Sequence, residues 1–281
     1  MRIAVITCLN DRPHISRIFL ENIKKHGLDT FACVSSQADA ELAGSYYATT
    51  IRHDNISAGH KWNAILNHVL KEEEYTHFFI MADDDGISDE GIALLRKSAE
   101  DGNSYVGFKK NYFVDTLTGK AHVHEQQYQA NKLCGAGCLI SRKAIMDACD
   151  MVEINVILTI ETPAKTWLPG KHIVSRSVGE YLEGYKGYAR IIGGRWHNLW
   201  PSKGNGLDHA REMRLVMAGH PPVAVDDDRV HITDFKSAKN IWSYESVREK
   251  FHGPESTIEE AMWFMSDSEK DYVRSLIKSR Q

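Results

Sequence analysis

Three consecutive aspartates, Asp83 to Asp85, follow the apolar run Phe78-Phe79-Ile80-Met81-Ala82 and precede Gly86. Adjacent carboxylates repel one another and are costly to remove from water unless a cation neutralises them. Mg²⁺ and Mn²⁺ prefer one or two carboxylates together with phosphate oxygens and water. An acidic turn at the end of a buried strand therefore predicts a divalent metal site that stabilises a diphosphate leaving group. A solvated loop is the alternative, because Asp is common in turns.

The composition is that of an ordinary globular protein. The chain has 281 residues, 42% hydrophobic and 26% charged, with a formal net charge of −4. This charge argues against strong sequence-independent binding to nucleic acid, although it leaves room for a local basic groove. No segment approaches the roughly 18 apolar residues of a membrane-spanning helix, so we expect a soluble, cytoplasmic protein with no membrane span. The five cysteines are expected to be buried thiols.

The first hundred residues alternate between strand-like and helix-like patterns. This rhythm predicts a mostly parallel sheet with helices on both faces. Ligands bind such sheets at the carboxyl ends of the strands, so the loops after Thr7, Val34 and Met81 are expected to border one crevice. The predicted strands cover residues 2–7, 31–34, 49–52 and 76–81, and the predicted helices cover 15–25, 58–70 and 89–99.

The rest of the chain gives a less regular pattern. Residues 105–141 indicate short strands and loops, and residues 161–206, rich in Gly, Pro, Trp and Tyr, predict long loops. A helix is expected over 207–218 and a strand over 223–230. Residues 259–278 predict a helix in two pieces, with Ser266-x-x-Glu269 as a capping box.

Several motifs resemble those of family-2-type GT-A glycosyltransferases. The strand Ile3–Thr7 with the loop Cys8-Leu9-Asn10-Asp11-Arg12-Pro13 is similar to the opening strand and Asn-Arg-Pro loop of these enzymes. The segment Asn55–Asn63 resembles their Gly-containing entry into a helix, and Asp83-x-Asp85 matches their Asp-x-Asp signature. Gly135-Ala136-Gly137, followed by Ser141-Arg142, is similar to the glycine loop of the family. The resemblance covers residues 1–145 and thins beyond them.

The resemblance implies a GT-A (nucleotide-diphospho-sugar transferase) fold, α/β, with a mostly parallel central sheet flanked by helices. It also implies transfer of a hexosyl or pentosyl group from a nucleotide sugar, with a UDP-sugar favoured, to an acceptor hydroxyl. Mn²⁺ or Mg²⁺ would be held by Asp83 and Asp85. These enzymes often have an Asp after the second strand where this chain has Ser35-Ser36, so the nucleotide base stays open. The donor-binding residues implied are Thr7, Asn10, Arg12, Lys61, Asn63, Asp83, Asp84 and Lys236.

Such enzymes usually carry an acidic base at the start of a helix and a metal-binding His beyond the next strand. Asp208 and His231 fit this pattern, because a predicted helix, the glycine stop at Gly219 and a predicted strand separate them. Glu180 and His197 are the alternative pair. Asp208 would deprotonate the acceptor hydroxyl, and one base suits an inverting displacement, although retaining enzymes share the scaffold. A carboxylate that stabilises the helix dipole and a buried structural His are the plainer interpretations.

The same resemblance divides the chain into a catalytic domain and an extension. Residues 1–250 would form the GT-A domain, with a nucleotide-binding half over 1–100 and an acceptor half over 101–250. Residues 251–281 would form a C-terminal helical extension. Tryptophans and basic residues in the 161–206 region could bind an acceptor, and both a nucleic acid and a glycan stay open.

Two other classes of function compete with the glycosyltransferase. A nucleotidyltransferase would ordinarily carry a Gly-rich phosphate loop after the first strand, whereas Cys8-Leu9-Asn10-Asp11-Arg12 contains no glycine. A P-loop enzyme is excluded because no Gly-x4-Gly-Lys-Ser/Thr sequence occurs. A non-catalytic nucleotide- or carbohydrate-binding module on the same fold is the remaining alternative, although the acidic turn and a candidate base are intact.

Overall fold

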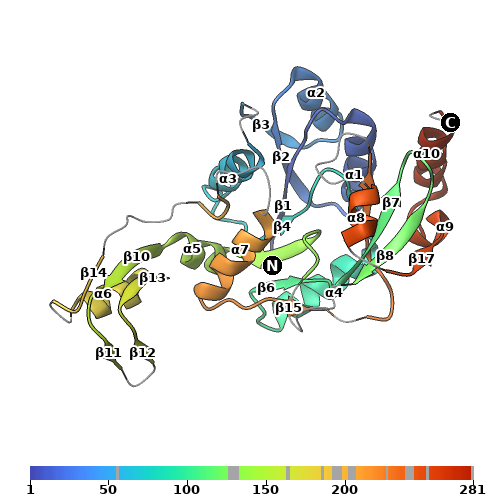
Figure 1. The fold of residues 1–281 in the computed structure, drawn as a ribbon. Helices are drawn as coiled ribbons and strands as arrows, with labels where there is room; N and C mark the ends of the chain where they lie inside the picture. Colours follow the sequence, from blue (N-terminus) through green and yellow to red (C-terminus); the bar gives the residue numbers. More distant parts are fainter. Residues whose placement is uncertain are drawn as a thin grey trace.

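A seven-stranded sheet forms the centre of the molecule in this computed structural model (Figure 1). Its strand order is β15-β6-β9-β4-β1-β2-β3, and every strand except β9 runs in the same direction. The predicted α/β class with a mostly parallel sheet is thereby confirmed. The strands are β1 (Ile3–Cys8), β2 (Asp29–Val34), β3 (Thr49–Arg52), β4 (His77–Ile80), β6 (Tyr105–Gly107), β9 (Cys138–Ser141) and β15 (Val223–Ala224). The described residues are 1–54, 57–125, 133–162, 165–184, 187–191, 198–201, 207–225, 227–237, 244–250 and 253–279.

Helices cover both faces of this sheet. Alternate residues of β1 point to opposite faces, so Val5 belongs to one buried cluster and Ile6 to the other. The Val5 cluster includes apolar residues of α1 (Pro13–Lys25), α2 (Gln37–Ser45) and α4 (Asp89–Glu100). The Ile6 cluster includes those of α3 (Ala58–Val69), α5 (Arg142–Cys149) and α7 (Leu207–Met217). Each fully buried Ile, Leu or Phe side chain contributes roughly 1.5–3 kcal/mol, so these clusters fix the frame of the site.

Most helices around the sheet begin with a serine cap. The side chains of Ser36, Ser57, Ser88 and Ser141 each accept a hydrogen bond from a backbone N–H three residues later. Such caps contribute about 1 kcal/mol each and fix where a loop becomes a helix. Helix α1 has no side-chain cap and instead begins at Pro13, whose missing N–H has no role in the first turn.

A second sheet of five strands, ordered β17-β8-β7-β16-β5, continues from the acidic turn. One face packs on α1 and on α9 (Ile258–Ala261) and α10 (Asp267–Lys278), through a cluster that contains Ile18, Phe235 and Val273. The two-piece C-terminal helix and the Ser266 capping box are confirmed. The domain boundary at residue 250 stays a prediction; β17, which follows it, pairs with β8. The strands are β5 (Asp85–Ile87), β7 (Lys110–Asp115), β8 (Ala121–Glu125), β16 (Ile232–Lys236) and β17 (Glu255–Ser256).

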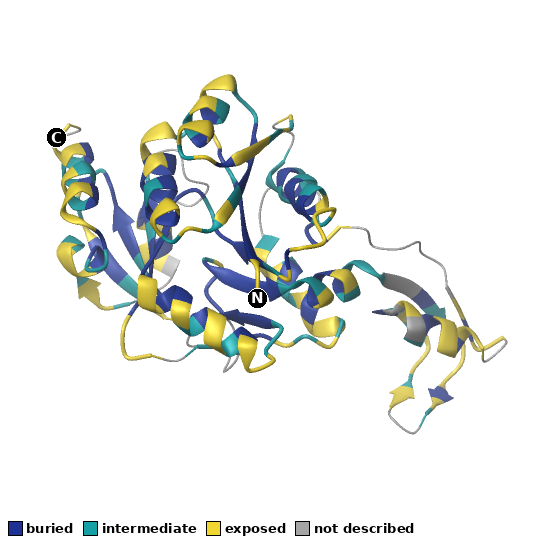
Figure 2. Ribbon diagram, turned by 180° about the vertical axis from the view of Figure 1, so that it is seen from behind, coloured by how far each residue is buried: buried dark blue, intermediate teal, exposed yellow. Residues whose placement is uncertain are grey.

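Residues 151–191 form a small lobe that lies apart from the central sheet (Figures 1 and 2). Strand β10 (Met151–Val156) pairs antiparallel with β13 (Gly170–Ser175) and β14 (Ala189–Ile191). Helix α6 (Arg176–Glu183) packs on them around a separate apolar cluster. The expectation of long loops over 161–206 is therefore wrong for much of the lobe. Its strands are short and separated by Gly and Pro, which conceals their alternation; the hairpin β11 (Ile160–Glu161) and β12 (Thr166–Trp167) is an example.

The strand expected over 223–230 is present at its start and shorter than predicted. Of the described residues in that range, Val223–Ala224 pair with the central sheet as β15, and the next strand, β16, begins after His231. Within the described ranges, no helix combines the length and the apolar character needed to cross a lipid bilayer.

Candidate metal centre and active site

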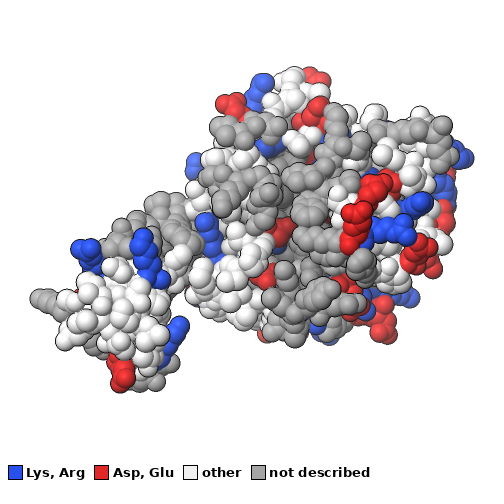
Figure 3. Space-filling model, viewed as in Figure 1, with Lys and Arg blue, Asp and Glu red and all other residues white. Residues whose placement is uncertain are grey.

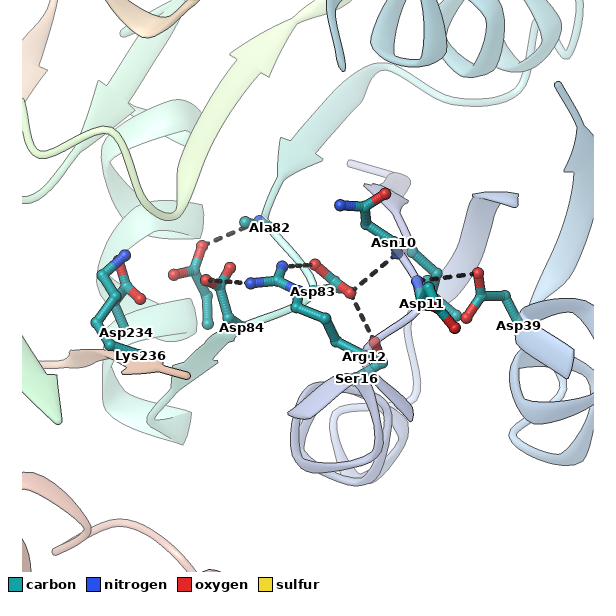
Figure 4. Close-up of polar contacts among 12 residues, drawn as sticks. Asn10, Asp11, Arg12, Ser16, Asp39, Ala82, Asp83, Asp84, Asp234 and Lys236 are labelled. Atoms are coloured by element: carbon teal, nitrogen blue, oxygen red, sulfur yellow. Dashed lines mark hydrogen bonds and ion pairs between the residues drawn. The ribbon is translucent and has the colours of Figure 1, made fainter. Parts of the chain in front are cut away.

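The pairing of β5 with β16 gathers three carboxylates. The strands run antiparallel, and Asp234 is the register partner of Asp85. The Phe235 N–H donates to the Asp84 carbonyl at 2.8 Å, which fixes the turn against β16. The Ala82 N–H donates to Asp85 Oδ2 at 2.9 Å. As a result, one carboxylate oxygen each of Asp84, Asp85 and Asp234 lie within 4.8 Å of one another, and we call these residues the acidic cluster (Figure 4).

Two cations lie next to these carboxylates. The Arg12 guanidinium contacts Asp83 and donates from Nη1 to Asp84 Oδ2 at 3.1 Å, and Lys236 Nζ donates to Asp234 Oδ2 at 2.6 Å. The three turn carboxylates and Asp234 carry four negative charges when ionised, against two positive charges. The excess of two equals the charge of one divalent cation, and burial makes that excess costly.

Burial raises the carboxyl pKa values in the acidic cluster. Burial, followed by the charges of Asp234 and Asp84, raises the pKa of Asp85 well above its usual range. Burial also raises the pKa of Asp234 to about 7, although Lys236 opposes the shift. Among the described residues, Asp234 Oδ1 is buried without a hydrogen-bond partner. Buried oxygens that cannot all ionise without a cation are the donor set that Mn²⁺ or Mg²⁺ takes, so the residues fit the implied metal.

Asp83 is held away from the acidic cluster by other partners. Its carboxylate accepts from Ser16 Oγ at 2.6 Å and from the Asn10 N–H at 3.4 Å, in addition to its contact with Arg12. Asp83 therefore ties the loop after β1 to the acidic turn. The structure groups Asp85 with Asp84 and Asp234 rather than with Asp83, and a direct metal or donor contact of Asp83 stays a prediction.

His231 also lies outside the acidic cluster. Its Nδ1 is 2.7 Å from Ser88 Oγ and its Nε2 is 3.1 Å from Asp227 Oδ2, so both ring nitrogens are engaged. His231 lies outside the cluster because it immediately precedes β16 and is next to Ser88, which follows β5. Asp234, three residues later in β16, is paired with Asp85. Asp234 rather than His231 therefore lies in the acidic cluster, and a direct metal contact of His231 stays a prediction.

Lys61 and Asn63 are engaged with the backbone around the site. Lys61 Nζ donates to the Leu9 carbonyl at 2.5 Å. The Asn63 side-chain amide donates to the Trp200 carbonyl at 2.8 Å and accepts from the Trp200 N–H at 3.0 Å. Thr7 is buried, and its hydroxyl has no hydrogen-bond partner in the described parts of the chain. Lys61 therefore supports the loop after β1, and contact of Thr7, Lys61 and Asn63 with a donor stays a prediction.

Asp208 lies beside the glycine loop of β9. Its side chain is 63% exposed, and Oδ1 is 3.4 Å from Nη1 of the buried Arg211. A methyl group on Gly135 would lie 2.5 Å from Asp208 Oδ2, so only glycine permits this approach. Burial raises the pKa of the preceding residue, Cys134, well above its usual range, and the charges of Asp85 and Asp234 are among the smaller contributions.

The structure says less about the alternative base and metal ligand, Glu180 and His197. Glu180 is an exposed residue of α6 in the small lobe, and it pairs with Arg176 at 2.7 Å. His197 lies outside the described residues. The lobe carries exposed Lys and Arg side chains (Figure 3), which suits the basic acceptor surface that the sequence suggested.

Sequence reasoning missed Asp234 and Ser16. A weak signal for Asp234 existed: in Ile232-Thr233-Asp234-Phe235-Lys236, the period of a strand places Asp234 and Lys236 on one face, with Phe235 on the other. Ile232 shares the face of the two charged residues, which conceals the pattern. The register pairs Lys236 with Asp115, which borders a hollow of about 510 Å³. Its other lining residues include Lys120, Tyr244 and Arg248.

Neither a protein-family profile nor a curated protein matches the chain. Several solved structures do. TarS of S. aureus aligns with all of this chain at 13% identity and a TM-score of 0.42, and the chain spans only 43% of that TarS structure. A structure from Desulfovibrio desulfuricans, assigned as a nucleotide-diphospho-sugar transferase, aligns over 100% of this chain and 99% of its own at 9% identity and a TM-score of 0.43.

A third solved structure aligns with part of this chain. The 4-diphosphocytidyl-2C-methyl-D-erythritol synthase of Anaerococcus prevotii aligns over 52% of this chain and 74% of its own, at 10% identity and a TM-score of 0.34. These likenesses concern the fold alone. The fold of this chain, a mostly parallel sheet flanked by helices with an acidic turn after β4, has the architecture that the motifs predicted.

Proposed function

We propose that the protein is a metal-dependent glycosyltransferase that moves a sugar from a nucleotide-diphosphate sugar to an acceptor hydroxyl. The observation that carries the proposal is the acidic cluster, which lies just beyond the carboxyl end of β4. With Asp83, Arg12 and Lys236 included, its ionised groups carry an excess of two negative charges, which one divalent cation would neutralise. Ligands of open α/β sheets bind at this edge. A diphosphate and its metal therefore fit both the place and the charge.

The residues around the acidic cluster have separate roles in this proposal. Asp84, Asp85 and Asp234 would hold Mn²⁺ or Mg²⁺, which when bound stabilises negative charge on the leaving diphosphate. Lys236, next to Asp234, would add positive charge for the phosphates. Arg12 holds Asp83 and Asp84 in place, and it keeps the loop after β1, with Asn10, beside the metal residues. That loop would bind the nucleoside, with a UDP-sugar favoured.

Asp208 is the proposed base for the acceptor. Its carboxylate is exposed on the first turn of α7 and is oriented by Arg211, so it can accept a proton from a hydroxyl that approaches from solvent. Gly135 lies against this carboxylate, and a side chain at that position would displace it. A glycan and a nucleic acid both stay open as acceptors, and the basic side chains of the small lobe would suit a phosphorylated one.

The test is a binding and turnover panel. UDP-, GDP-, CMP- and TDP-sugars are added with and without Mn²⁺ to the wild type, Asp85→Ala and Asp208→Asn, and thermal unfolding and release of nucleotide are measured. We expect one donor to stabilise the wild type only with metal, by about 2.7 kcal/mol at 100 times its dissociation constant. Asp85→Ala should lose this response, whereas Asp208→Asn should keep it and lose turnover.

Two outcomes would contradict the proposal. Release of pyrophosphate from a nucleoside triphosphate, without turnover of any nucleotide sugar, would support a nucleotidyltransferase. Donor binding that is the same with and without Mn²⁺, and the same in Asp85→Ala, would support a metal-free binding module.

A further inference from the structure

Two cysteines lie side by side at the carboxyl ends of β1 and β2. Cys8 and Cys33 are register partners in adjacent parallel strands. Neighbouring strands are about 4.7–4.9 Å apart, which lies within the range of about 4.4–6.8 Å between the Cα atoms of disulfide-bonded cysteines. Register partners project to the same face, and both side chains pack into the cluster beneath α3. The two side chains lie close enough for each thiol to affect the pKa of the other.

The surroundings of this pair favour a thiolate. Lys61 lies in the first turn of α3, and its ammonium donates to the carbonyl of Leu9, the residue after Cys8. The Cys8 side chain, together with the charge of Lys61, lowers the pKa of Cys33. Burial raises the pKa of Cys8, so the shared proton resides on Cys8.

The other cysteines have no comparable surroundings. Burial raises the pKa of Cys138 and of Cys149 to about 11 and that of Cys134 well above its usual range. Thiolates react with peroxides, whereas protonated buried thiols are inert. Cys8 is partly exposed and Cys33 is buried, so a small oxidant meets the pair at Cys8.

We propose that Cys8 and Cys33 form a redox-active dithiol, at which a peroxide closes a disulfide across β1 and β2. The shared proton passes to Cys33, and the Cys8 thiolate attacks the peroxide. The O–O bond breaks, one oxygen stays on Cys8 as a sulfenic acid, and the other leaves as water after it takes up a proton. The Cys33 thiol gives its proton to this leaving oxygen, and the resulting Cys33 thiolate attacks the sulfenic sulfur. The S–S bond forms, the S–O bond breaks, and the departing hydroxide takes up a proton from solvent and leaves as water.

The two steps balance. Two thiols and one hydrogen peroxide give one disulfide and two molecules of water, and each sulfur is oxidised by one electron. The sulfenic acid is the reversible first oxidation state of a thiolate, and a neighbouring thiol converts it to a disulfide. The Leu9 N–H already donates to the Cys33 carbonyl at 3.0 Å, so the bond would form where the loop after β1 is tied to β2.

The test uses the full chain, reduced, exposed to hydrogen peroxide, blocked with N-ethylmaleimide and measured by intact mass and peptide mapping. We expect the mass of two hydrogen atoms to be lost, two fewer thiols to be alkylated, and a peptide that links Cys8 to Cys33 and disappears with dithiothreitol. Cys33→Ser should stop at a sulfenic acid on Cys8, which dimedone traps. Cys149→Ser, the matched control at another partly exposed cysteine, should form the link as the wild type does.

A second measurement does not depend on oxidation. Phenylarsine oxide binds two neighbouring thiols at once, so we expect Cys8→Ser and Cys33→Ser to bind it at least about 100-fold more weakly than the wild type, through loss of the second, intramolecular bond. Cys149→Ser should bind it unchanged. Unchanged arsenical binding in Cys8→Ser would overturn the proposal. So would a wild-type disulfide that involves Cys134, Cys138 or Cys149, or oxygen added to Cys8 without a cross-link.

Discussion

The variant Asp234→Asn removes one negative charge from the acidic cluster with little change of shape. In the metal-free protein, burial and the charge of Asp84 raise the pKa of Asp234 from 3.8 to about 7. A folded state with the higher pKa binds more protons than the unfolded chain between these two values. The carboxyl group therefore has no effect on stability below pH 3.8, and it lowers stability as the pH rises towards 7 and above.

The size of the effect follows from the same shift. Roughly three pKa units correspond to about 4 kcal/mol at pH 8, at 1.36 kcal/mol per unit. Lys236 loses its ionised partner in the variant, which offsets part of the gain. We therefore expect metal-free Asp234→Asn to be more stable than the wild type by about 1–3 kcal/mol at pH 8, or about 2–5 °C in melting temperature. The difference should approach zero near pH 4.

The assay is thermal unfolding in EDTA and in Mn²⁺ at pH 5 and pH 8. Asp228→Asn is the matched control, because Asp228 is an exposed residue of the loop before β16. Mn²⁺ should stabilise the wild type and the control but have little effect on Asp234→Asn. The reasoning is refuted if Asp234→Asn in EDTA is less stable than the wild type at pH 8, or if it gains as much stability from Mn²⁺.

Three further predictions concern the surroundings of the acidic cluster. Because Asp234 must lose its proton to bind metal, Mn²⁺ affinity should rise by up to about tenfold per pH unit between pH 6 and 7; calorimetry in buffers of different ionisation enthalpy should show proton release, and its absence would contradict the raised pKa. Gly135→Ala places a methyl group against the Asp208 carboxylate, so the transfer rate should fall by about 100-fold while donor affinity is kept. Kinetics in which the transfer rate and the donor affinity fall equally would contradict an effect of Gly135 that acts through Asp208 alone. Arg12→Met leaves Asp83 and Asp84 buried without their cation, and urea unfolding should show a loss of about 3–5 kcal/mol; a change below 1 kcal/mol would mean that these carboxylates are already protonated.

Local patterns in the sequence predicted most of the frame. The strands and helices before residue 100 mostly alternate with clear periods. Among the described residues there, the sequence missed α2, which is short and polar on most of its surface, and the three-residue strand β5. The acidic turn was recognisable because three aspartates directly follow a buried strand. Such features depend on neighbours in the sequence, so one chain is enough to predict them.

The composition of the acidic cluster depends on contacts between distant residues. Asp234 meets Asp85 only through the antiparallel register of β5 and β16, which are nearly 150 residues apart in the chain. The sequence analysis predicted a strand that ends just before His231, whereas β16 begins just after it. For this reason Asp234, and not His231, is paired with Asp85. The small lobe was missed for a related reason: its pairs, such as β10 with β13, join short segments whose alternation is interrupted by glycine and proline.

The most direct test of the central claim is a titration of Mn²⁺, detected by electron paramagnetic resonance, with and without a nucleotide sugar. The account predicts that the wild type binds a single Mn²⁺, more tightly when the donor is present, that Asp85→Ala loses this binding, and that Asp228→Asn keeps it. Mn²⁺ binding that survives Asp85→Ala, or a donor that does not change the affinity for Mn²⁺, would contradict it.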